Sequence, residues 1–355
     1  MVSSLTHCGR LDTRQPVVAA AARTFGMRKA TAVLLAGALV GTAALVGAAF
    51  IRDMREAERR IAGRSEVIAS SFGQLEYAVA GQGPDLLMVH GTGGGFDQGL
   101  AFTEELSRRG HRVIAPSRFG YLRSDFPDAP SSERQADAFA ELLDRLDVGR
   151  VAVAGGSAGA LSALQFALRH PQRCSALILI VPAANVRGTD PVQMTALQAF
   201  LVRLLAGSDL LFWIGLELRR DAMIRTLLAT QPSLVRAAPI EEQQRVQRIL
   251  RGILPVSRRT RGMLNDASLA GRPARIAFSR ITVPTLVISA QDDLFGTAST
   301  ARDIAAAVPG ARLVVYPSGG HVWVGRDASL WSEVARFLQE ASLADQAEVA
   351  APSLR

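Results

Sequence analysis

The sequence has 355 residues, a formal net charge of +8 and 48% hydrophobic residues, of which few are aromatic. This composition is typical of a folded globular protein and excludes an intrinsically disordered chain. Only two cysteines occur, Cys8 and Cys174, so a disulfide framework is excluded. Cys174 has no polarising neighbour in the sequence and is predicted to be a buried structural thiol.

The N-terminal part of the chain contains an apolar segment of membrane length. Residues 30–51 are 22 consecutive residues without a charge, and charged residues border them on both sides. As a helix this segment spans about 33 Å, which is enough to cross a bilayer. We predict a tail at 1–29, a single-pass transmembrane anchor at 30–51 and a charged linker at 52–64.

A cleaved signal peptide is the main alternative to the anchor, because Gly47-Ala48-Ala49 is a small-residue cleavage pattern. A signal peptide has an apolar region of only about 7–15 residues, which favours an uncleaved anchor. Arginine and lysine are similarly frequent on both sides, so the positive-inside rule does not decide the orientation; we place the folded domain outside the cytoplasm. Gly37 and Gly41 form a GxxxG pattern that allows a homodimer, although chance explains it equally well in a glycine-rich segment.

From residue 65 onwards, short apolar runs alternate with helix-like segments. Continuous apolar runs are typical of parallel strands whose two faces are both covered by helices. The sequence therefore predicts an α/β fold with a mostly parallel sheet of about eight strands. The predicted strands are a pair within 72–81 and single strands at 85–90, 111–116, 151–154, 176–181, 285–289 and 311–316, and the predicted helices are 102–109, 132–146, 161–170 and 329–341.

The alternation is interrupted by an arginine-rich, helical segment between the sixth and seventh strands. We predict a helical cap at 185–280, which divides the domain into core segments at 65–184 and 281–341, followed by a tail at 342–355. From 187 to 280 there are 15 arginines and 7 acids, so this stretch carries 15 − 7 = +8. Two interpretations remain: the charge binds anionic lipid, or it lies on solvated helix faces. On the first interpretation, Arg258, Arg259 and Arg261 are expected to contact lipid and to have no catalytic role.

The segment Gly155-Gly156-Ser157-Ala158-Gly159 follows a predicted strand and opens a predicted helix. In this context, the G-x-S-x-G pattern forms a tight turn that presents a nucleophilic serine at the carboxyl end of the sheet. Gly155 and Gly159 are small where the turn leaves no room for larger side chains. We therefore predict a strained backbone at Ser157 and a nucleophilic role for its hydroxyl. The alternative is a glycine-rich turn without function.

A nucleophilic serine needs an acid and a histidine later in the chain. Of the five histidines, only His321 follows an acid that comes after a strand, and it lies in a glycine-rich loop after the last predicted strand. Two neighbouring carboxylates, Asp292 and Asp293, compete for the role of the acid. The alternative for His321 is an ordinary surface histidine.

These motifs resemble those of the alpha/beta-hydrolase superfamily, in its cap-bearing branch of esterases, lactonases and cofactor-free haloperoxidase-like enzymes. The resemblance covers residues 65–341, and it includes the loop 90–95 (HGTGGG), the serine motif 155–159 (GGSAG), the acid loop and the loop Gly319-Gly320-His321 in family order. It implies Asp293 as the acid, with Asp292 as the alternative.

The resemblance also implies an oxyanion hole built from the backbone N–H groups of Thr92 and Ala158. Gly91 and Gly93 then allow the loop to approach a substrate, and His90 braces the loop rather than acting as a catalyst. Neither a cofactor nor a metal is expected.

The segment from Pro116 to Ser124 resembles the family's D-x-x-G-x-G-x-S loop with two departures. Ser117 replaces the acid and Leu122 replaces the second glycine. A serine nucleophile in place of an aspartate argues against epoxide and haloalkane hydrolysis.

Taken together, the sequence predicts a membrane-anchored serine hydrolase that uses Ser157, His321 and Asp293. Its expected substrate is a carboxylic ester, a lactone or a lipid-like molecule, and its expected partner is a membrane bound through residues 30–51. No motif of nucleic-acid binding occurs. The alternative function is a non-catalytic, membrane-anchored binding or scaffold domain that retains the motifs.

Overall fold

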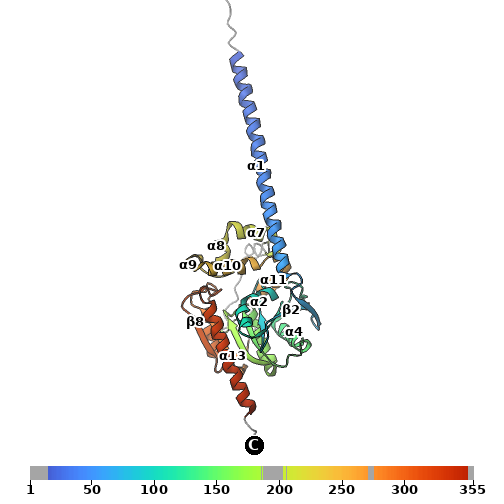
Figure 1. Ribbon diagram of the computed structural model, residues 1–355, viewed down its shortest axis with the longest axis vertical. Helices are drawn as coiled ribbons and strands as arrows, with labels where there is room; N and C mark the ends of the chain where they lie inside the picture. The colour runs from blue at the N-terminus through green and yellow to red at the C-terminus, as the bar shows by residue number, and fades with distance from the viewer. Residues whose placement is uncertain (1–14, 185, 187–202, 205, 271–275, 351–355) are drawn as a thin grey trace, which may run out of the picture. The chain divides into compact units, whose positions relative to one another are not determined.

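The computed structural model describes residues 15–184, 186, 203–204, 206–270 and 276–350 (Figure 1). The chain divides into two compact units, Met1–Arg55 and Glu56–Arg355. The helix α1 (Gln15–Ile61) makes up the described part of the first unit and continues into the second.

Within α1, Leu34–Ile61 is long and apolar enough to cross a membrane, with a hydropathy of 2.2 and no burial in its most apolar window. A membrane anchor and a signal sequence both meet this test. The charged linker predicted at 52–64 is helical up to Ile61 and continuous with the rest of α1, and its Ala57 and Ile61 are buried. The second compact unit accordingly begins at Glu56, before the predicted start at residue 65.

The second unit is built around an eight-stranded sheet in the order β1-β2-β4-β3-β5-β6-β7-β8. β1 pairs with β2 and β2 pairs with β4 in antiparallel fashion, and the other pairs are parallel. This confirms the predicted, mostly parallel sheet. The strands are β1 (Glu66–Ser70), β2 (Gly73–Ala80), β3 (Asp85–Val89), β4 (Arg112–Pro116), β5 (Val151–Gly156), β6 (Cys174–Ile180), β7 (Thr285–Ala290) and β8 (Arg312–Tyr316).

Two predicted elements differ from the structure. The strand pair predicted within 72–81 is a single strand, β2, whose partner β1 lies earlier at 66–70. β1 is an edge strand without buried residues, so it lacks the continuous apolar run by which the other strands are recognised. The helix predicted at 102–109 is two short helices, α2 (Phe96–Phe102) and α3 (Glu104–Arg108).

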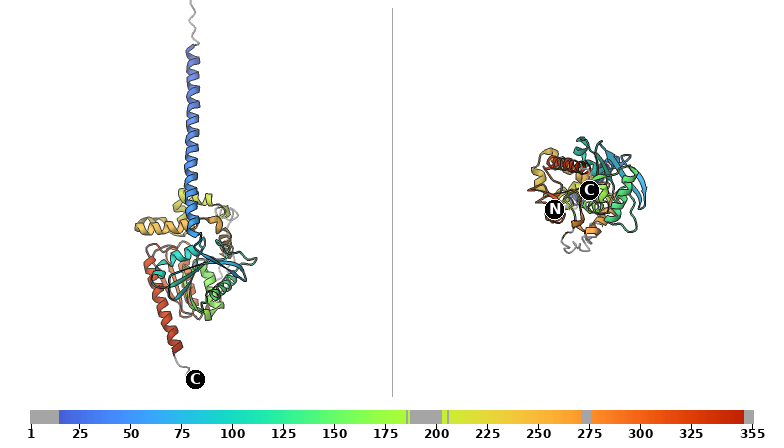
Figure 2. Two further views of the ribbon diagram at one scale, coloured as in Figure 1. Left: turned by 45° about the vertical axis from the view of Figure 1, so that its right-hand side comes forward. Right: turned by 90° about the horizontal axis from the view of Figure 1, so that it is seen from below.

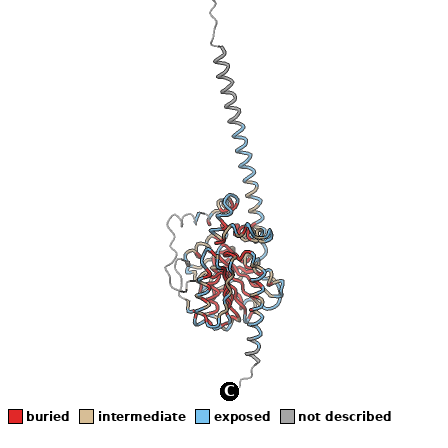
Figure 3. Tube along the Cα trace, turned by 90° about the vertical axis from the view of Figure 1, so that its left-hand side faces the viewer, coloured by how far each residue is buried: buried red, intermediate tan, exposed pale blue. Residues whose placement is uncertain are grey.

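Helices cover both faces of the sheet, and buried residues run along the strands (Figure 3). Alternate residues of each apolar strand point to opposite faces. One face packs on α4 (Ser132–Arg145), α5 (Gly159–Arg169) and α12 (Thr297–Ala307). The other packs on α3 and α13 (Asp327–Ala350), where Trp331 is fully buried.

Between β6 and β7 the described chain is helical, as predicted for the cap. These helices lie together on one side of the sheet (Figures 1 and 2). They are α7 (Asp209–Leu218), α8 (Arg220–Leu227), α9 (Pro232–Ala237), α10 (Ile240–Gly252) and α11 (Thr260–Ala270). The same stretch of chain contains two short 3-10 turns, η2 (Val256–Arg258) and η3 (Phe278–Arg280), and a third, η1 (Pro171–Arg173), precedes β6. Part of the predicted cap, including Arg187, lies outside the described residues.

Candidate active site

Ser157 stands at a sharp turn between β5, which ends at Gly156, and α5, which begins at Gly159. Its φ is +50°, in the left-handed region that a residue with a Cβ rarely adopts, so the predicted strain is confirmed. The turn is tightly packed: a Cβ at Gly159 would lie 2.4 Å from the carbonyl oxygen of Val89, and one at Gly155 2.7 Å from Ala163 Cβ. Only glycine fits these positions.

His321 lies between Ser157 and Asp293. Its Nε2 is 2.9 Å from Ser157 Oγ and its Nδ1 is 2.7 Å from Asp293 Oδ2. The three residues follow the carboxyl ends of β5, β7 and β8, which lie in the sheet order β5-β6-β7-β8. A parallel sheet brings these ends to one edge, so residues 164 positions apart in the sequence meet there.

The carboxylate of Asp293 is fully buried and held by neighbours that sequence reasoning missed. Asp293 Oδ1 accepts a hydrogen bond from the backbone N–H of Phe295 at 2.9 Å, and Oδ2 accepts one from the hydroxyl of Thr297. Thr297 is in turn 2.9 Å from the hydroxyl of Ser289 on β7. These contacts fix the carboxylate toward His321.

Asp292 does not contact the imidazole. Its Oδ1 accepts hydrogen bonds from the backbone N–H groups of Gly319 and Gly320, at 2.9 and 2.8 Å. The backbone N–H of His321 itself donates to the hydroxyl of Thr230, a buried residue of the cap segment. Asp292 and Thr230 therefore anchor the loop that carries the histidine, and nothing in the local sequence marks either for this position.

Of the two predicted oxyanion donors, Thr92 lines the same cavity as Ser157, and Ala158 directly follows Ser157 in the turn. Among the described residues, no protein acceptor takes a hydrogen bond from the backbone N–H of Thr92 or of Ala158, so both are free to bind an oxygen of a substrate. Gly91, Thr92 and Gly93 line a cavity together with Ser157 and His321.

This cavity has a volume of about 210 Å³ and is lined mostly by apolar side chains from the core and from α8, α10 and α11. Among the described residues, His321 is its only lining side chain that is able to carry a charge. Phe295 is 58% exposed and packs edge-on against His321 at 5.0 Å. The apolar side chains that line the cavity are Phe102, Val181, Leu227, Leu228, Ile249, Ile253, Met263, Phe295, Val322 and Trp323.

His90 is buried, and both its ring nitrogens are engaged. Nε2 accepts a hydrogen bond from the backbone N–H of Arg118 at 2.9 Å, and Nδ1 is 2.7 Å from the carbonyl oxygen of Gly91. Burial, together with the charge of Arg118, lowers the pKa of His90 well below its usual value, so the ring is neutral. His90 connects two loops and offers no free base to Ser157.

The loop after β4 explains how the chain tolerates its two departures from the family pattern. Ser117 donates to Glu76 Oε2 at 2.8 Å, so a buried carboxylate from β2 lies beside the position where the family has an acid. Leu122 has a φ of +51°, the left-handed conformation that a glycine adopts without strain.

Five of the described cap arginines form ion pairs within the protein, so this part of the cap charge is not free to bind lipid. Arg258 pairs with Glu58 at 2.8 Å. Arg259 is fully buried; it pairs with Asp97 at 2.8 Å and donates to the carbonyl oxygen of Gly94. The expectation that Arg259 contacts lipid is therefore wrong, because its charge is used inside the protein. Ion pairs also form at Arg236–Asp221, Arg245–Glu242 and Arg251–Glu217.

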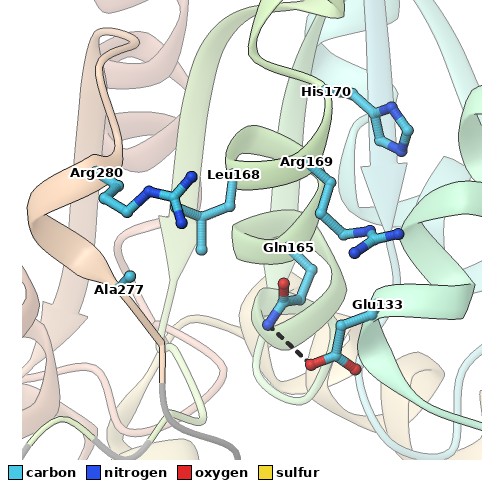
Figure 4. A pocket seen from close by; sticks show the side chains of 7 residues that line it. All are labelled: Glu133, Gln165, Leu168, Arg169, His170, Ala277 and Arg280. Atoms are coloured by element: carbon cyan, nitrogen blue, oxygen red, sulfur yellow. Dashed lines mark hydrogen bonds between the residues drawn. The ribbon is translucent and has the colours of Figure 1, made fainter.

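A larger cavity of about 550 Å³ lies elsewhere, beside the end of α5 (Figure 4). Its lining is polar, and Arg169, one of its two arginines, already pairs with Asp137. In Figure 4, Arg280 extends toward Leu168, and Gln165 bonds to Glu133. None of the described residues that line it is a serine, threonine or cysteine, so they offer no hydroxyl or thiol nucleophile.

Cys174 is fully buried, and burial raises the pKa of its thiol to about 12, as expected for a structural cysteine. Among the described residues, no group of three or more His, Cys, Asp or Glu side chains is placed to hold a metal ion.

Comparison with known proteins places the chain among hydrolases. The model of the family described as "Alpha/beta hydrolase family" matches residues 86–352. The chain is 30% identical over 275 residues to a 2-hydroxy-6-oxononadienedioate/2-hydroxy-6-oxononatrienedioate hydrolase of Paraburkholderia xenovorans, covering 74% of this chain and 88% of that protein. It is 29% identical over 258 residues to a putative carbamate hydrolase of Klebsiella pneumoniae, covering 71% and 89%.

Solved structures of alpha/beta hydrolases are similar to this chain in fold. An alpha/beta hydrolase fold protein from Nakamurella multipartita is similar with a TM-score of 0.62 and 26% identity, covering 78% of this chain and 99% of that one. The enol-lactonase from Burkholderia xenovorans shares the fold with a TM-score of 0.61 and 21% identity, covering 77% and 100%. These matches indicate an enzyme of the hydrolase class, and the chain belongs to the alpha/beta hydrolase family.

Proposed function

We propose that this protein is a membrane-anchored serine hydrolase that cleaves a neutral carboxylic ester or lactone through an acyl-enzyme. The observation that carries the proposal is the continuous contact from Ser157 Oγ to His321 Nε2 and from His321 Nδ1 to Asp293 Oδ2. Ser157 and His321 line a cavity together with Thr92, the residue proposed to supply an oxyanion donor.

In the proposed reaction, Ser157 Oγ attacks the carbonyl carbon while His321 Nε2 takes the hydroxyl proton. The carbonyl oxygen becomes an oxyanion that accepts hydrogen bonds from Thr92 and Ala158. The C–O bond to the alcohol then breaks, and His321 returns its proton to the leaving oxygen. Water, deprotonated by His321, attacks the acyl-enzyme in the same way and releases the acid and the free serine. Asp293 holds the imidazole in the required tautomer throughout.

The non-catalytic alternative is tested by labelling the full chain with a fluorophosphonate, which reacts only with an activated serine. We expect stoichiometric labelling of Ser157. A folded protein that is not labelled and hydrolyses no ester is a scaffold rather than an enzyme.

The choice of a neutral substrate rests on the lining of the cavity. The relative from Paraburkholderia xenovorans is named for a substrate with two carboxylates, yet no described cation lines the cavity of this chain. The nearby Arg118 and Arg259 are already paired with Asp266 and Asp97. A carboxylate entering this space would lose its hydration without gaining a partner.

Two esters of the same shape test this point. We expect p-nitrophenyl pentanoate to have a kcat/KM at least about 100-fold higher than mono-p-nitrophenyl glutarate, because burying an unpaired carboxylate costs several kcal/mol. Steady-state kinetics on both esters give the ratio. Equal kcat/KM values would show that a cation reaches the acyl site and that the neutral class is wrong.

Membrane anchoring is supported by the length and hydropathy of the candidate span. We expect the full chain to sediment with membranes and to resist extraction by carbonate. A chain shortened to begin at Glu56 is expected to be soluble and active. It retains Ala57, Arg60 and Ile61; Arg60 donates to the carbonyl oxygens of Arg251 and Leu254 in the cap, at 3.0 and 2.8 Å. Recovery of the protein cut near Ala49 in a soluble fraction would favour a signal peptide instead.

A further inference from the structure

The loop 91–94, which carries the proposed oxyanion donor Thr92, contains three glycines, which restrain a backbone little. One backbone hydrogen bond closes the loop internally, from the Gly94 N–H to the Gly91 carbonyl oxygen at 3.2 Å. The direction of the Thr92 N–H depends on this backbone, and contacts from outside the loop also hold it. Each residue of the loop has such a contact. Gln98 accepts from Gly91 N–H, Asp266 accepts from the Thr92 hydroxyl, Tyr121 accepts from Gly93 N–H, and Arg259 donates to the Gly94 carbonyl.

Asp266, on the cap helix α11, is at the centre of these contacts. Its Oδ2 accepts hydrogen bonds from the hydroxyls of Thr92 and Tyr121, at 2.8 and 2.5 Å. Arg118 donates to both carboxylate oxygens at 2.7 Å. One carboxylate thus holds Thr92 directly and Gly93 through Tyr121.

The cluster formed by Asp266, Arg118 and Tyr121 is buried, so its geometry is well defined. The side chains of Arg118 and Asp266 are 7% and 4% exposed. Burial lowers the pKa of Arg118, but the interactions of Arg118 with Asp266 and Tyr121 together outweigh burial and raise that pKa. Burial raises the pKa of Tyr121 well above its usual value, so its hydroxyl keeps its proton and donates. Removing the carboxylate would leave the Arg118 charge buried without a partner.

The cap helix approaches this cluster closely because of Gly262. A Cβ at this position would lie 2.1 Å from the ring of Tyr121. The backbone N–H of Gly262 also donates to the carbonyl oxygen of Gly120 at 3.0 Å. The neighbouring Met263 lines the cavity over Ser157. α11 therefore touches both the substrate space and the support of the loop.

We propose that Asp266, held by Arg118, is a positioning residue that directs the Thr92 N–H toward the oxyanion. The cap is then part of the machinery that stabilises the transition state, in addition to covering the cavity. This inference rests on the proposed serine-hydrolase function and assigns no contact between Asp266 and the substrate.

The test measures kcat per active site, with active sites counted by fluorophosphonate titration. Asp266→Asn in the full chain is expected to lower kcat per titrated site by about 10-fold to 100-fold, since a misplaced oxyanion donor loses part of its effect on the transition state. KM for p-nitrophenyl pentanoate should change little. A purely structural role would reduce the number of titratable sites and leave kcat per site unchanged, which would overturn the proposal.

Variants of Thr92 test the same contact without disturbing the buried ion pair, in case Asp266→Asn does not fold. Thr92→Val keeps the backbone N–H and removes the hydroxyl, so it should lower kcat per site in the same direction. Thr92→Ser keeps the hydroxyl and should restore the parental value. Adding Asp266→Asn to Thr92→Val should cost less than Asp266→Asn alone, because both changes remove one contact.

Asp209→Asn is the matched control. Asp209 is also a cap carboxylate and accepts two hydrogen bonds from Ser257, but it has no contact with the loop 91–94. Its kcat per site should equal that of the parent. Parental kcat in both Thr92→Val and Asp266→Asn would overturn the inference while leaving the hydrolase function intact. A parent that is neither labelled nor active would instead refute the proposed function.

Discussion

Ser157→Ala is expected to lower kcat for p-nitrophenyl pentanoate by about 10⁴-fold or more, because without the hydroxyl no acyl-enzyme forms. The fold should persist. Alanine is smaller than serine and has the same Cβ, so the strained φ of +50° costs no more than before. The hydrogen bond from the Ser157 N–H to Ile180, at 2.9 Å, belongs to the backbone and remains. Steady-state kinetics and thermal unfolding followed by circular dichroism measure the two effects.

A second variant, His321→Ala, should be comparably inactive, because the serine hydroxyl then has no base at 2.9 Å. Loss of labelling by a fluorophosphonate should accompany both changes. Turnover retained in Ser157→Ala by a pure protein would show that the nucleophile lies elsewhere, and the assignment of the whole site would fail with it.

The second large effect is expected at the acid. Asp293→Asn should lower kcat by up to about 10⁴-fold, since an amide in this position favours the wrong tautomer of the imidazole. An Asn N–H that donates to His321 Nδ1 leaves the proton on Nε2, which then cannot accept the proton of Ser157. KM should change little, because Asp293 does not line the cavity.

Asp292→Asn is the matched control, one residue away and with the same change of charge. The amide oxygen of asparagine is still able to accept the hydrogen bonds of Gly319 and Gly320 that Asp292 Oδ1 accepts. We therefore expect a loss of about 10-fold or less, from weaker bonds that hold the histidine loop less firmly. A larger loss in Asp292→Asn than in Asp293→Asn would transfer the role of the acid to Asp292.

The amino-acid sequence alone was sufficient for the fold class, for Ser157 and His321, and for narrowing the acid to two neighbouring carboxylates. Continuous apolar runs require strands covered on both faces, and parallel strands bring their carboxyl ends to one edge. A glycine-flanked serine after such a strand has few alternatives to a tight turn. The chain order of Ser157, Asp293 and His321 is therefore readable without coordinates, because each residue follows a strand that is recognisable from its own local pattern.

The long-range contacts that hold the site residues in place could be found only in the tertiary structure. Asp266 meets Thr92 across 174 positions of sequence, and Arg118 meets Asp266 across 148. Nothing local distinguishes a buried arginine such as Arg259 from a solvated one on a cap helix, because the helical periodicity shows which face is apolar and not where a charge finds its partner. Likewise, Asp292 and Asp293 are adjacent and chemically identical. Their roles separate only when the chain folds and gives one carboxylate to two glycine N–H groups and the other to the imidazole.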